Sequence, residues 1–213
     1  MKGFMMSNKK YEFVDGDTIE HNGITLKRIR ANVAIGLTVS AGDLGGYIQS
    51  EENLSRMDDA WVSDNARVFG DARVFDNARV FGDAWVFGDA WVFGDARVFG
   101  DACVSGNARV FGDACVFGDA RVFGDARVFG NAWVFGNAWV ENDKSIFWAT
   151  KVGNNNDTLT AFKNKDGKIT LVHECFIGSI SEFKATLEEK HDERTKREYK
   201  LLIKVAKSRI LGE

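Results

Sequence analysis

The stretch Ala78-Arg-Val-Phe-Gly-Asp83, followed at once by Ala84-Trp-Val-Phe-Gly-Asp89, decides the fold of this chain. The same unit runs without interruption from Ala60 to Asp143, in fourteen copies of Ala-x-Val-x-Gly-Asp/Asn, and Gly fills the fifth position in eleven of them. A six-residue period would scatter Ala and Val around a helix, whereas in a strand residues two apart share one face. Each hexad is therefore predicted to be a short strand followed by a corner that uses the turn chemistry of Gly-Asp or Gly-Asn.

Strands and corners that repeat without helices predict a solenoid. The hexads resemble those of the hexapeptide-repeat family, and this resemblance implies a left-handed parallel β-helix of triangular section with three hexads to a coil. Fourteen hexads then make about five coils, and ~4.8 Å per coil gives a prism roughly 22 Å long. The expected fold class is an all-β solenoid with a cap at each end.

Outward side chains of one coil should stack on those of the next coil, eighteen residues later, and form two rows on each of three flanks. The rows of the first flank are Trp61, Arg79, Arg97, Cys115, Trp133 and Phe81, Phe99, Phe117, Phe135. Those of the second flank are Arg67, Trp85, Cys103, Arg121, Trp139 and Phe69, Phe87, Ser105, Phe123. Those of the third flank are Arg73, Trp91, Arg109, Arg127 and Phe75, Phe93, Phe111, Phe129. Arg side chains in these rows can stack on Phe or Trp.

Two interpretations of the outward rows remain open, and both can hold on different flanks. The stacks can stabilise the coil from outside, or they can form an interface, since exposed aromatic surface commonly marks a contact with a partner. The family resemblance implies trimers that pack flank to flank. We expect a homo-oligomer, most simply a trimer, with its contact or binding surface on the first flank, at Phe81, Phe99, Phe117, Phe135, Arg79, Arg97 and Trp133.

Both open ends of a solenoid need a cover, and three regions follow: an N-terminal β-rich cap at residues 1–59, the repeats at 60–143 and a C-terminal α+β cap at 144–213. Asn22-Gly23 lies between the segments Thr18-Ile-Glu-His21 and Ile24-Thr-Leu-Lys-Arg-Ile29 and predicts a tight hairpin. Residues 41–55 are expected to form an irregular first coil or a lid. Gly45-Gly46 within them is interpreted as a backbone device in preference to a ligand-binding loop.

The C-terminal region contains the signals of one hairpin and two helices. Residues 158–162 and 168–176 flank a Lys165-Asp-Gly-Lys168 turn, after a polar break at 154–157. Ser179-Ile-Ser-Glu182 has the capping-box pattern of a helix start, and apolar residues recur at helical spacing from there to Ile210. A β-hairpin plus two helices is the expected C-terminal cap.

Charge and cysteine content narrow the function classes. A net charge of −3 is too balanced for a general nucleic-acid binder. No run of 18 apolar residues is present and residues 1–10 lack the apolar core of a signal peptide, so neither membrane insertion nor export is expected. Three cysteines at irregular spacing suit reduced thiols in a cytoplasmic protein.

No catalytic residue, metal site or cofactor is predicted. The resemblance to hexapeptide-repeat acyltransferases would require a His base in a cleft between subunits and loops that interrupt the coils. The repeats hold neither, and His21, His173 and His191 all lie outside them. Cys103 and Cys115 have no His nearby in the sequence to activate them. The repeats offer one carboxylate per corner, which is too few oxygens for calcium.

The hexads together with residues 42–55, Leu159-Thr-Ala-Phe162 and Cys175-Phe-Ile-Gly-Ser179 resemble small phage and prophage proteins that are often labelled hexapeptide transferases. That resemblance implies an accessory role in a bacterial host cell. Our first hypothesis is a non-enzymatic binding or structural module that binds a host protein or sequesters a host signalling nucleotide. The alternative hypothesis is an acyl-CoA-dependent acyltransferase.

Overall fold

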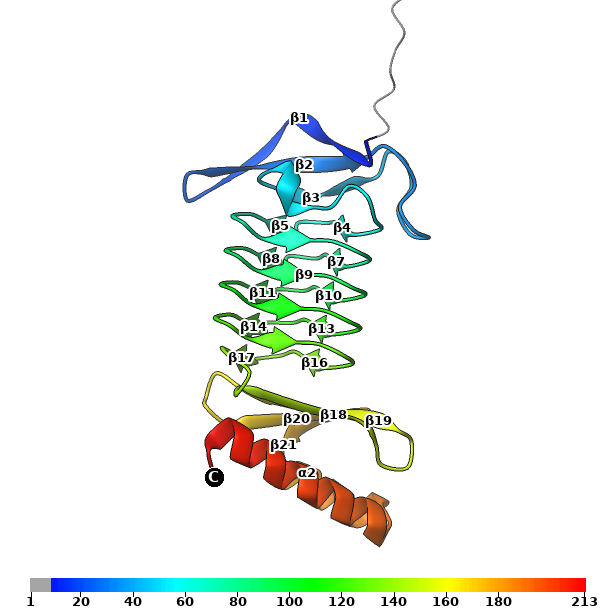
Figure 1. Cartoon of the computed structure of the whole chain (residues 1–213), viewed down its shortest axis with the longest axis vertical. Helices are drawn as coiled ribbons and strands as arrows, with labels where there is room; N and C mark the ends of the chain where they lie inside the picture. Colours follow the sequence, from blue (N-terminus) through cyan, green and yellow to red (C-terminus); the bar gives the residue numbers. More distant parts are fainter. Residues whose placement is uncertain (1–8) are drawn as a thin grey trace, which may run out of the picture.

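Each hexad contributes its Ala and Val to the inside of a solenoid of about five turns. The computed structural model describes residues 9–213, so the first eight residues of the expected N-terminal cap, and with them the expectation about a signal peptide, lie outside the described residues. All fourteen repeat alanines and all fourteen repeat valines are at most 1% exposed. The predicted inward face of the repeat is therefore confirmed, and the solenoid rises as a stack of flat coils between two caps (Figure 1).

The three flanks are parallel sheets in which each strand pairs with the strand eighteen residues away. The first flank consists of β4 (Trp61–Val62), β7 (Arg79–Val80), β10 (Arg97–Val98), β13 (Cys115–Val116) and β16 (Trp133–Val134). The second consists of β5 (Arg67–Val68), β8 (Trp85–Val86), β11 (Cys103–Val104), β14 (Arg121–Val122) and β17 (Trp139–Val140). The third consists of β6 (Arg73–Val74), β9 (Trp91–Val92), β12 (Arg109–Val110) and β15 (Arg127–Val128).

Corner glycines turn the chain with positive φ and let the coils stack closely. Gly100 has φ +68°, and a Cβ there would lie 3.0 Å from the backbone nitrogen of Gly118 in the next coil. Asp64 and Asp76 replace Gly in two corners with φ values of 56° and 61°. The carboxylate of Asp64 accepts a hydrogen bond from the Gly82 N–H at 3.0 Å, so Asp turns the crowded contact into a favourable one.

The outward Phe rows form stacked ladders, as the eighteen-residue spacing predicts. On the first flank Phe81, Phe99, Phe117 and Phe135 stack with ring centroids 4.5–4.8 Å apart and planes within 9° of parallel. The third flank repeats this arrangement from Phe75 to Phe129. Ser105 interrupts the ladder of the second flank. Because each ring covers its neighbour, most of these Phe side chains are only half exposed, and the ladders stabilise the coil.

The N-terminal cap extends the second flank by three strands. β1 (Tyr11–His21) and β2 (Ile24–Ala31) form the hairpin predicted around Asn22-Gly23. β2 pairs antiparallel with β3 (Leu44–Ile48), and β3 pairs in parallel with β5. The expected irregular first coil is thus a coil that begins with a regular strand and continues through a short 3-10 helix, η1 (Glu51–Asn53). Gly45 and Gly46 lie against Trp61, Val62 and Ala66 with no space for a Cβ, in agreement with a backbone role.

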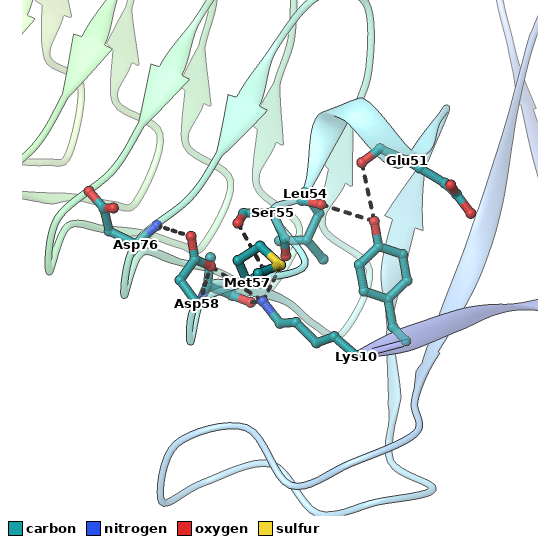
Figure 2. A network of polar contacts seen from close by, with 9 residues as sticks. Lys10, Glu51, Leu54, Ser55, Met57, Asp58 and Asp76 are labelled. Atoms are coloured by element: carbon teal, nitrogen blue, oxygen red, sulfur yellow. Dashed lines mark hydrogen bonds and ion pairs between the residues drawn. The ribbon is translucent and has the colours of Figure 1, made fainter. Parts of the chain in front are cut away.

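A buried lysine connects this cap to the first coil (Figure 2). The Lys10 side chain is 5% exposed, and its Nζ donates to the carbonyls of Ser55 at 2.8 Å and Ala60 at 2.6 Å. The carboxylate of Asp58 lies 3.5 Å from the same nitrogen and accepts a hydrogen bond from the Asp76 N–H. Burial lowers the pKa of Lys10, while Asp58 opposes the shift.

The C-terminal cap contains more sheet than the sequence predicted. In place of one hairpin there are four antiparallel strands: β18 (Ile146–Val152), β19 (Asp157–Lys163), β20 (Ile169–His173) and β21 (Phe176–Ser179). The predicted C-terminal cap began at residue 144, but no strand was predicted for the Ile-Phe-Trp run that opens β18. Glu174, with φ 49°, splits the expected second strand into β20 and β21. Two helices, α1 (Ile180–Lys190) and α2 (Glu193–Leu211), follow the predicted Ser179 cap.

The four-stranded sheet lies between the last coil and the helices (Figure 1). Ile146, Phe162 and Val172 join the core of the solenoid, whereas Leu159, Leu171 and Val152 pack against Phe183, Leu187 and Ile203 of the helices. Neither helix in the described part of the chain has the length and apolar character needed to cross a membrane.

Candidate functional site

A groove of about 830 Å³ lies between the loop of residues 32–43 and the upper coils of the first flank. Its wall is the tip of the loop, Gly36 to Thr38. Its floor comes from three successive coils, which contribute Trp61 from β4, Arg79 from β7 and Arg97 from β10. Figure 1 shows this loop as the blue segment that descends beside β4.

A bridge between Ile35 and Val39 holds the loop in place, and the tip between these two residues lies over the groove. Ile35 and Val39 form an isolated antiparallel bridge and are 2% and 9% exposed. Leu37 between them is fully exposed, and Leu44 beyond the loop is 51% exposed. A Cβ on Gly36 would lie 2.9 Å from the Arg79 guanidinium, so the backbone of the loop rests directly on that side chain. The groove therefore offers an apolar rim above a floor that carries two guanidiniums.

Each arginine of the other two flanks except Arg127 lies over a Trp ring, and Arg127 has no such partner among the described residues. Arg67 lies over the ring of Trp85 at 4.6 Å, Arg109 over Trp91 at 5.1 Å and Arg121 over Trp139 at 5.8 Å. Within residues 9–213, neither Arg79 nor Arg97 has a hydrogen-bond, ion-pair or aromatic partner of this kind. These two guanidiniums occupy successive coils in register, so they present adjacent unpaired donors to the groove.

Three carboxylates, those of Asp43, Asp59 and Asp95, also line the groove, and among the described residues none of them forms an ion pair with Arg79 or Arg97. Asp43 accepts a hydrogen bond from the Ser40 N–H at 2.7 Å, and Asp95 accepts one from Asn77 Nδ2 at 3.1 Å. Burial lowers the pKa of Arg79, Asp59 opposes that shift, and the neighbouring Arg97 adds to it. A ligand anion between the two guanidiniums would relieve their repulsion and pair donors that the protein leaves open.

Of the seven residues proposed from the sequence, three line this groove: Arg79, Arg97 and Phe81. Phe99, Phe117 and Phe135 continue the ladder below it. Trp133 lies at the other end of the flank, 49% exposed, beside a separate hollow. Sequence reasoning missed the loop of residues 32–43, because a segment without periodicity gives no sign of the flank on which it will lie.

The three histidines lie away from the groove. His21 packs edge-on to Trp85 of the second flank at 4.6 Å. His173 is buried in the C-terminal cap, where burial lowers its pKa and its Nε2 contacts the Tyr199 hydroxyl at 2.7 Å. His191 packs edge-on to the other side of Tyr199. Cys103 and Cys115 are free thiols whose pKa is raised by burial, which disfavours the thiolate.

Comparison with known proteins supports the solenoid. Residues 72–88 and 120–136 match the family model described as the YdcK β-solenoid repeat. Each matched segment is about one coil long and lies within the repeats. No curated protein matches the chain.

Proposed function

We propose that this protein is a non-enzymatic binding module whose ligand site is the groove under the loop of residues 32–43. The observation that carries the proposal is a pair of unpartnered guanidiniums, Arg79 and Arg97, which lie in adjacent coils and both line the groove. Arg67 and Arg109 on the other flanks instead cover Trp rings. Guanidinium pairs suit phosphate groups, which accept several charge-assisted hydrogen bonds at once. The exposed Leu37 and Leu44 and the edge of Phe81 suit a planar, partly apolar group.

A nucleotide combines these two parts, so a small nucleotide is the ligand class that we propose. This agrees with the role in sequestering a host signalling nucleotide that the phage resemblance suggests. The same proposal includes membership of the hexapeptide-repeat family, left-handed winding of the coils, a phage or prophage origin and a cytoplasmic location.

Acyl transfer finds less support. The groove has neither a His nor a thiol among its lining residues. The imidazole of His173 is buried beneath helix α2 against Tyr199, and His21 packs edge-on against Trp85. We expect calorimetric titration with acetyl-CoA to give no heat of binding. Saturable binding at micromolar concentration that is lost on replacing His21 would favour the acyltransferase.

The proposal can be tested by calorimetric titration of the full chain with GMP, guanosine and inorganic phosphate. We expect saturable binding of GMP and at least tenfold weaker binding of guanosine. The double variant Arg79→Ala/Arg97→Ala should bind GMP at least tenfold more weakly, since each charge-assisted hydrogen bond contributes about 1.5–3 kcal/mol.

Arg109→Ala is the matched control, because Arg109 occupies the same position of the hexad on the third flank and lies outside the groove. It should bind GMP as the wild type does. Equal weakening in the control and in the double variant, or no saturable binding of any nucleotide, would refute the proposed site. The host-protein form of the hypothesis would then be the one to pursue.

A further inference from the structure

The C-terminal cap brings together three metal-ligating side chains that the sequence keeps apart. Asp157 begins β19, His173 ends β20 and Glu174 occupies the turn into β21. One ring nitrogen of His173 and one carboxylate oxygen from each of Asp157 and Glu174 lie within 4.8 Å of one another. The antiparallel pairing of β19 with β20 brings these residues together. Leu159 lies opposite His173, and Asp157 is two residues before Leu159 in the same strand.

The surroundings of His173 resemble those of a metal-bound histidine. A ligating imidazole usually makes a hydrogen bond through its second nitrogen, which fixes the orientation of the ring. Here Nε2 contacts the Tyr199 hydroxyl of α2 at 2.7 Å, while Nδ1 has no hydrogen-bond partner within the described residues. The ring also packs against Phe183, and the residue is 4% exposed. These contacts fix the orientation of the imidazole and leave Nδ1 as the nitrogen that can bind a metal ion.

The two carboxylates lie close enough to bind one cation together. Their ligand oxygens lie within 4.8 Å of one another. The Asn155 amide donates to Glu174 Oε1 at 2.7 Å and so orients the second carboxylate from outside the cluster. Glu174 is exposed, so its side chain has the freedom to close on an ion. A cation between the two carboxylates would offset the repulsion of like charges at this distance.

Two of the three residues, Asp157 and Glu174, line a hollow of about 320 Å³ together with Trp133 and Asn131 from the last coil and with Thr158, Thr160 and Val172 of the sheet. His173 does not line this hollow and packs on the side of α2. The carboxylates are therefore reached from the side of the last coil, while the imidazole is held from the side of the helices. Three protein ligands fit the coordination of a zinc ion that keeps a water molecule in its fourth position.

From this geometry we propose that Asp157, His173 and Glu174 bind a divalent transition-metal ion of the zinc type, with His173 ligating through Nδ1. One nitrogen and two carboxylate ligands favour such an ion over calcium, which prefers six to eight oxygens. The site would link β19 and β20 to helix α2 through the Tyr199 hydroxyl.

The test is calorimetric titration of the full chain with Zn²⁺, followed by the absorption spectrum of the Co²⁺-loaded protein. We expect one Zn²⁺ per chain and a loss of affinity of at least tenfold in both Asp157→Asn and Glu174→Gln. Tyr199→Phe, which removes only the hydroxyl, should weaken binding by roughly 10- to 100-fold. Asp166→Asn, an exposed acid in the turn between β19 and β20, is the matched control and should leave affinity unchanged.

Glu174→Gln keeps the test decisive even if a variant at a buried position fails to fold, since Glu174 is exposed and makes its only described hydrogen bond with Asn155. Absence of saturable Zn²⁺ binding would overturn the proposal. So would unchanged affinity in Glu174→Gln, or a thiolate-to-cobalt charge-transfer band, because that band would assign the metal to the cysteines.

Discussion

At the scale of single residues, Lys10 shows how one buried charge fixes the N-terminal cap to the solenoid. Its ammonium group fills the space between two carbonyls and the Asp58 carboxylate. We expect Lys10→Met to destabilise the protein by about 1–3 kcal/mol, because the substitution leaves those acceptors without a donor. Chemical denaturation followed by circular dichroism measures this loss.

Lys9→Met provides the comparison for this prediction. Lys9 is 50% exposed and reaches Glu51 only at 3.7 Å, so its removal should change stability by less than about 0.5 kcal/mol. If the two variants unfold at the same denaturant concentration, the Lys10 network does not hold the cap.

At the scale of elements, the corner sets the distance between coils. Gly100→Ala should cost about 1–2 kcal/mol, since an L-residue with positive φ is strained and its Cβ approaches the Gly118 nitrogen. Gly100→Asp should cost less, because Asp64 adopts the same conformation and accepts the hydrogen bond of the next coil. Thermal unfolding of both variants tests this order, and an Asp variant less stable than the Ala variant would contradict it.

The repeats could be predicted closely because their physics is periodic. Ala and Val every six residues determine the inward face, and the eighteen-residue register determines which Phe and Arg stack. The extra strand β18 was not predicted, because its residues lack the regular alternation of inward and outward side chains that marks a strand. The groove and the His173 cluster were not predicted for a different reason. Both depend on contacts between segments that lie far apart in the sequence.

The candidate residues show the same division. Arg79, Arg97 and Phe81 were identified from their row on the first flank, and the structure places them in the groove. The eighteen-residue register places Arg109 beside Trp91 and Arg121 beside Trp139, and both arginines lie over those rings. The same register places Arg79 beside Trp61 without such a contact among the described residues, so register alone did not identify the unpartnered arginines.

At the scale of the whole molecule, the first flank also remains our predicted contact between subunits. Its lower half presents Phe99 and Phe117, half exposed in their ladder, and ends at the strongly exposed Trp133. Light scattering should give a mass of about three times the 23.7 kDa chain. Phe99→Glu together with Phe117→Glu should dissociate this assembly while the β circular-dichroism signal persists. A wild-type protein that stays at the mass of one chain would refute the oligomer.

The central claim is that the unpartnered arginines on the first flank form a site for an anionic ligand. Native mass spectrometry of the protein equilibrated with an equimolar mixture of GMP and guanosine tests it most directly. The account predicts that the wild type and Arg109→Ala each retain one GMP per chain and no guanosine, and that Arg79→Ala/Arg97→Ala retains neither. Equal retention of GMP by the double variant, or equal retention of guanosine and GMP by the wild type, would contradict it.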